Sequence, residues 1–65
     1  MASGDPLQRG RQAFDRRQWK EAHRQLSAAH QRSPLAPEHL EQLATATYLI
    51  GKEAEASRLW QQLHY

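Results

Sequence analysis

The chain has 65 residues and no cysteine, so it forms one small domain at most and has neither a disulfide nor a thiolate metal site to stabilise it. Its mean hydropathy of −0.95 is low, and the sequence has neither a secretory signal nor the ~20 apolar residues that a membrane span needs, so we expect a cytoplasmic protein. The net charge of +2 is uneven, because residues 1–32 carry seven Lys or Arg against three acidic residues (net +4), whereas residues 33–65 carry two against four (net −2).

The first half of the chain predicts two helices. Asp5 suits a helix N-cap and Pro6 suits the first helical position, so a helix is expected from residue 6 to about residue 17. A second helix is expected over 19–32, ending before Pro34, because the residue before a proline is pushed out of the helical region. The apolar stripe of this second helix consists of Trp19, Ala22, Leu26 and Ala29.

The second half predicts two more helices. Pro37 opens the third, and Gly51 suits its C-terminal end because glycine takes a positive φ without strain. The fourth runs from about residue 53 to the end, with Ala56, Leu63 and either Leu59 or Trp60 turned inward. The predicted fold is all-α, with two antiparallel helical hairpins stacked on each other. Its expected divisions are a flexible N-terminus (1–5), a first hairpin (6–34) and a second hairpin (35–65).

The two halves resemble each other when position 21 is aligned with position 55 and the rest of the chain follows in register. Glu21, Ala22, Arg24 and His30 then meet identical residues, and similar types align elsewhere, such as Gly10 with Ala44 and Phe14 with Tyr48. Residues aligned in this way are called counterparts below. Small residues recur where two helices would cross, and large ones recur beside them. The residues expected to pack the hairpins are Gly10, Trp19, Ala22, Leu26, Ala29, Leu43, Ala44 and Ala56.

This pattern resembles the tetratricopeptide repeat, a family with a 34-residue period of paired helices. The first copy departs from the family pattern at Arg9, where a leucine is usual, and Ala13 and Thr47 stand where a tyrosine is usual. The runs 9–14, 19–22, 26–29 and 40–51 also look like a bacterial family in which such an array precedes a LuxR-type helix-turn-helix domain, or sometimes a nucleotide cyclase domain. This resemblance implies the N-terminal part of a transcriptional regulator, whose DNA-reading domain would lie beyond residue 65.

Two surfaces are predicted to bind protein. The apolar side chains of the fourth helix cannot all face one preceding hairpin, so a second copy, another chain or a continuation of a longer chain is expected to cover them. In the tetratricopeptide family the inner face of each first helix often binds peptides, although Phe14 and Tyr48 could instead fill the space between hairpins. The predicted edge comprises Leu59, Trp60, Leu63 and Tyr65, and the predicted inner groove comprises Leu7, Arg11, Phe14, Asp15, Glu41, Thr45, Tyr48 and Leu49.

The remaining functional classes are less favoured. The alternative function is nucleic-acid binding through the basic first hairpin, which would require its arginines to line one surface; they could equally form a solvated helix face. The four histidines lack metal-ligand spacing, and no phosphate loop or nucleophile elbow accompanies the serines. We therefore expect neither a metal nor another cofactor, and no enzymatic activity.

Overall fold

The computed structural model describes residues 5–63 as four helices. Along the chain they are α1 (Pro6–Asp15), α2 (Trp19–Arg32), α3 (Pro37–Leu49) and α4 (Glu53–Leu63). The described part of the chain contains no strand, so the predicted all-α fold is confirmed.

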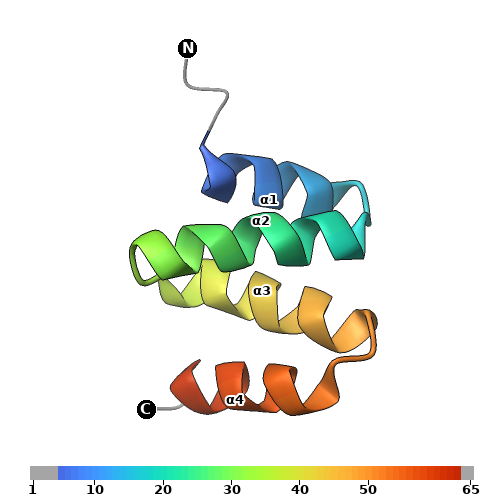
Figure 1. Cartoon of the computed structure of the whole chain (residues 1–65), viewed down its shortest axis with the longest axis vertical. Helices are drawn as coiled ribbons and strands as arrows, with labels where there is room; N and C mark the ends of the chain where they lie inside the picture. The colour runs from blue at the N-terminus through green and yellow to red at the C-terminus, as the bar shows by residue number, and fades with distance from the viewer. Residues whose placement is uncertain (1–4, 64–65) are drawn as a thin grey trace.

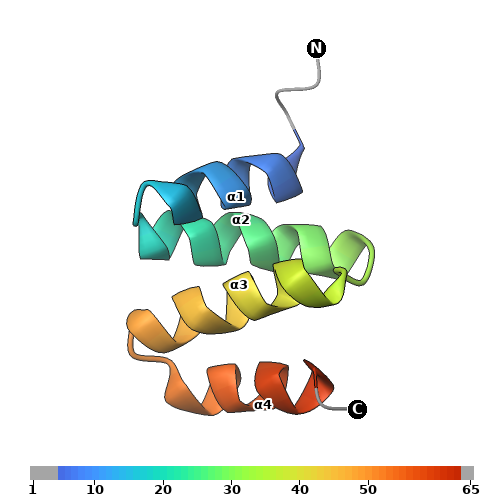
Figure 2. The same ribbon diagram turned by 180° about the vertical axis from the view of Figure 1, so that it is seen from behind.

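The helices form one stack in chain order, and each runs antiparallel to the next (Figure 1). α1 packs on α2 and α3 packs on α4, which gives two hairpins. α2 then packs on α3, with a smaller contact between α1 and α3, so the second hairpin stacks on the first (Figure 2). α2 and α3 therefore each have neighbouring helices on both sides.

The helix starts follow from local chemistry. The N–H of Leu7 donates to Asp5 Oδ1 at 3.0 Å, which satisfies one of the free donors at the start of α1. Pro6 and Pro37 occupy the first helical positions of α1 and α3. α2 ends where expected, with Ser33 in an extended conformation before Pro34 (φ −161°, ψ 131°).

The two hairpin turns have the same backbone geometry. After α1, the N–H of Arg17 donates to Phe14 O and the N–H of Gln18 to Ala13 O. After α3, the corresponding bonds run from Gly51 to Tyr48 O and from Lys52 to Thr47 O. These paired bonds define a Schellman motif, which needs a left-handed residue directly after the helix C-cap.

The left-handed residues of these motifs are Arg17, with φ of 60°, and Gly51, with φ of 90°. They are counterparts in the alignment of the two halves. α1 therefore ends at Asp15, before the predicted end at about residue 17, because Arg17 has already left the right-handed helical conformation. An arginine in this conformation is strained, whereas glycine is not.

Small side chains let the helices approach closely. Ala22, Ala44 and Ala56 are completely buried, and Leu26 packs against Gly10 so tightly that a Cβ added to the glycine would lie 2.6 Å from Leu26 Cγ. Trp19, in contrast, is only half-buried at the edge of the core. The other predicted packing residues, Ala29 and Leu43, are buried as well.

Candidate interaction surface

The last described helix turns its apolar stripe toward α3. Leu59 is buried in the core, whereas Trp60 and Leu63 are partly buried and pack against its margin. The structure thus places Leu59, the first member of the predicted edge, in the core with little surface left for a partner. Tyr65 lies outside the described residues. The opposite side of α4 is polar or small and exposed, with Ala54, Ser57, Arg58, Gln61 and Gln62.

Burial at counterpart positions of the two hairpins shows which part of α4 remains uncovered. Leu26 is fully buried, but its counterpart Trp60 is only partly buried. Ala29 is likewise buried, whereas its counterpart Leu63 is only partly buried. α3 packs on α2 in the first hairpin, and among the described residues no element packs on the equivalent side of the second. The counterparts in the second hairpin are less buried because this hairpin is the last one of the described stack.

Two aromatic side chains form the centre of this uncovered side. Tyr48 of α3 is 50% exposed, and its ring lies 5.9 Å from that of Trp60 at an interplanar angle of 53°. Leu49, next in the chain, is 48% exposed. The three side chains Tyr48, Trp60 and Leu63 are called the end face below; Leu49 is not counted, because its counterpart Asp15 is exposed as well.

The aromatic pairing differs between the hairpins. Phe14, the counterpart of Tyr48, is half-buried and makes an edge-to-face contact with Trp19 across the turn, with ring centroids 5.2 Å apart. Glu53 stands at the corresponding position of the second hairpin, so Tyr48 has no such partner there and rests on Trp60 instead. The end face thus has Trp60 where the first hairpin has Leu26, and its Tyr48 contacts Trp60 whereas Phe14 contacts Trp19.

The predicted inner groove is uneven. Leu7 and Phe14 are half-buried against the core, and Thr45 is also half-buried. Arg11, Asp15 and Glu41 are exposed. Tyr48 belongs to the end face and Leu49 is exposed, and the other exposed side chains of this surface are charged. It offers polar contacts beside the end face but few apolar anchors of its own.

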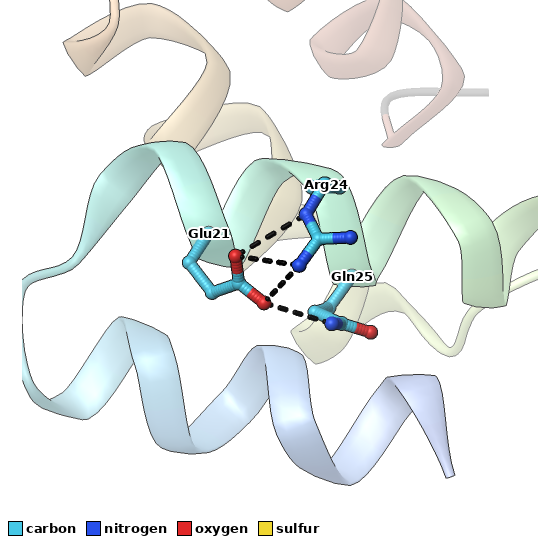
Figure 3. Close-up of polar contacts among 3 residues, drawn as sticks. All are labelled: Glu21, Arg24 and Gln25. Carbon is cyan, nitrogen blue, oxygen red and sulfur yellow. Dashed lines mark hydrogen bonds and ion pairs between the residues drawn. The ribbon is translucent and has the colours of Figure 1, made fainter. Parts of the chain in front are cut away.

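A polar cluster on α2 holds one of the arginines of the predicted basic surface. Arg24 Nη2 donates to both carboxylate oxygens of Glu21, at 2.9 and 2.8 Å, and Gln25 Nε2 donates to Oε2 at 2.8 Å (Figure 3). The hydrogen bond from Gln25 and then that from Arg24 lower the pKa of the Glu21 carboxyl. The cluster is open to solvent, and it neutralises one charge that nucleic-acid binding would use. The i, i+3 spacing of Glu21 and Arg24 was a sequence signal for this pair.

Basic side chains of both hairpins nevertheless meet along one depression. A hollow of about 550 Å³ lies beside α2 and the turn before α4, and its lining combines the basic residues Lys20, Arg24 and Lys52 with His23, Ser27, Ala28, Gln31 and Ile50. A larger one of about 750 Å³ lies where the start of α1 meets the loop between α2 and α3, and Leu7 and Leu35 line it. Both hollows are open to solvent.

Two of the described histidines, His23 and His30, make contacts that hold parts of the fold together. His23 Nε2 lies 3.0 Å from Glu55 Oε2, and this contact links α2 to α4 across the two hairpins. His30 Nδ1 accepts a hydrogen bond from the N–H of Leu35 at 3.2 Å, which fixes the loop between the hairpins. Within residues 5–63, no group of three or more His, Asp or Glu side chains is placed to hold a metal ion. His64 lies outside this range.

Comparison with protein-family models, with curated proteins and with solved structures finds no significant match to this chain. None of the helices described here combines the length and apolar character that crossing a membrane requires.

Proposed function

We propose that this chain is a non-catalytic protein-interaction and self-association module that binds protein through the end face. The observation that carries the proposal is the loss of burial between counterparts, from Leu26 to Trp60 and from Ala29 to Leu63. Burying the exposed part of the three large side chains of the end face is favourable at about 25 cal/mol per Å² of apolar surface. Aromatic residues such as Tyr48 and Trp60 are also the types that most often anchor protein interfaces.

The module is, in this proposal, of the tetratricopeptide type and forms the N-terminal part of a bacterial LuxR-type transcriptional regulator. Three agreements between counterparts support the repeat: complete burial of Ala22 and Ala56, burial of Gly10 and Ala44, and the shared turn geometry at Arg17 and Gly51. The reading frame that follows Tyr65 in the gene tests the longer protein. A helix-turn-helix domain there supports it, and a stop codon directly after Tyr65 contradicts it.

Sedimentation velocity over ~1 to ~300 µM protein tests self-association. We expect a concentration-dependent species larger than the monomer. Replacing Tyr48 by Gln should weaken this association, because the Tyr48 side chain is half exposed, packs on Trp60 and contributes surface rather than core. The matched control replaces Gln61 and Gln62 by Ala on the polar side of α4 and should leave association unchanged.

A folded monomer over the whole range, unaffected by these substitutions or by Trp60→Ala, contradicts the self-association part of the proposal. Circular dichroism of each variant shows whether it remains helical, so a loss of association is not confused with unfolding.

A further inference from the structure

The side of α3 that covers the first hairpin is identified by comparing α3 with α1. Leu43 is 2% exposed and Ala46 is fully buried, whereas their counterparts in α1, Arg9 and Gln12, are exposed. Since α1 has no helix before it among the described residues, the positions buried in α3 and exposed in α1 are those that the first hairpin covers.

Ile50, at the end of α3, follows the same trend. It is half-buried, and its counterpart Arg16 is exposed. Leu43, Ala46 and Ile50 are spaced three and four residues apart, so they lie on one side of the helix. We call these three residues the docking stripe. It is apolar, with a small residue at its centre.

The surface that meets the docking stripe recurs at the end face. Leu26 of α2 lies in one core cluster with Leu43 and Ala46 of α3. The counterpart of Leu26 is Trp60, which α4 presents at the margin of the core together with Leu63. The interface between the two hairpins therefore has two sides, the docking stripe of α3 and the surface of α2 around Leu26. The second side recurs on α4 around Trp60, where no described helix covers it.

A second copy of the chain, stacked with its α1 against the end face, does not supply a docking stripe. Its α1 would present Arg9, Gln12 and Arg16 at the three positions of the docking stripe. Two guanidinium groups would then face Trp60 and Leu63 where the docking stripe has Leu43 and Ile50, so the large apolar side chains of the stripe would be missing from this contact. The two ends of the stack are thus different surfaces, one polar and one apolar.

We infer that the end face binds a single amphipathic helix whose apolar stripe has the chemistry of the docking stripe. Such a stripe has a small residue with one large apolar residue three positions before it and another four positions after it. This inference rests on the proposed function and names the kind of partner. The second half of the chain carries a net charge of −2, so basic residues beside the stripe of the partner helix add attraction.

The test uses a dye-labelled synthetic peptide with the sequence of residues 36–51, titrated with the full chain and followed by fluorescence anisotropy. The peptide carries the docking stripe and is only marginally helical alone, so we expect saturable binding with a Kd of ~10–1000 µM. The control peptide has Gln at the positions of Leu43 and Ile50, and we expect it to bind at least about tenfold more weakly.

The site is tested with the Tyr48→Gln variant, which should also reduce affinity about tenfold, whereas the Gln61→Ala, Gln62→Ala variant should bind as the original chain does. Undiminished binding to the first variant places the peptide elsewhere, for example in exchange with the chain's own α3, and overturns the inference.

The helix inference and the proposed function can fail separately. If the chain self-associates through the end face, yet the peptide neither binds nor competes, a second copy is the occupant. The helix inference then fails while the proposed function stands. If neither self-association nor peptide binding occurs, the proposed function fails with it.

Discussion

Replacing Gly10 by Ala separates helix propensity from helix packing, because the two predict opposite signs. Gly10 lies inside α1, where Ala is favoured by about 1 kcal/mol. The structure places the new Cβ 2.6 Å from Leu26 Cγ and 2.7 Å from Leu26 Cδ2. Carbon atoms pack at about 3.5–4.0 Å, so either the helices separate or Leu26, which is fully buried, leaves its rotamer.

The magnitude follows from these opposing effects. Overpacking a close helix contact costs about 1–3 kcal/mol, and contacts this short favour the upper half of that range. After subtracting the propensity gain of about 1 kcal/mol, we expect Gly10→Ala to destabilise the chain by about 1–2 kcal/mol. For a domain of this size the melting temperature should fall by roughly 5–15 °C.

Urea and thermal unfolding, followed by far-ultraviolet circular dichroism, measure the effect. The decisive comparison is the same substitution in a Leu26→Ala background, studied with a stabilising osmolyte because Leu26→Ala alone costs about 2–5 kcal/mol. With Cγ and Cδ2 removed, Gly10→Ala should destabilise the chain by at least about 1 kcal/mol less, although the backbone N of Leu26, 3.0 Å from the added Cβ, remains a close contact. If Gly10→Ala stabilises the original chain, or if it costs as much in the Leu26→Ala background as in the original chain, the contact between α1 and α2 is wrong.

Three further predictions follow. Arg17→Gly should raise stability and Gly51→Ala should lower it, each by about 0.5–1 kcal/mol in urea unfolding, because both positions have positive φ; equal signs would contradict the turn geometry. The folded-state pKa of Glu21 is lowered, so its stabilising contribution is present above the ordinary value of 4.5 and is lost as pH falls through the lowered value. Between neutral pH and ~pH 3, the melting temperature should therefore fall less in the Glu21→Gln variant than in the original chain. An equal fall in both would contradict the hydrogen bonds to Glu21. Finally, a double-mutant cycle on His23→Ala and Glu55→Ala should give a favourable coupling of ~0.2–1 kcal/mol, whereas additive effects would show that this contact does not join the hairpins.

The helix boundaries that proline marks could be predicted from the sequence. Pro34 and Pro37 delimit the loop between the hairpins, since proline constrains both its own backbone and that of the residue before it. The end of α1 could not be predicted in the same way. Arginine carries no preference for a positive φ, and only the alignment of Arg17 with Gly51 points to the turn that the structure contains.

The candidate site was predicted in part. The periodicity of the last helix turns both Leu59 and Trp60 toward the core side and does not choose between them. The choice depends on how α4 rotates against α3, and the structure buries Leu59 while leaving Trp60 at the margin. The contact between His23 and Glu55 was missed for a related reason, since side chains so far apart in the sequence meet only when the stacking of the two hairpins is known.

The most direct test of the uncovered end face extends the chain in register. A second copy of residues 32–65, joined directly after Tyr65, continues the repeat without a shift, and its first helix brings a docking stripe to Trp60 and Leu63. The matched control carries Gln in place of Leu43 and Ile50 in the added copy only. The free energy of unfolding in urea should be higher for the first extension than for the control by ~1–3 kcal/mol, because in repeat arrays each matched interface adds stability. Equal stability of the two extended chains would contradict the claim that the end face is a packing surface for such a helix.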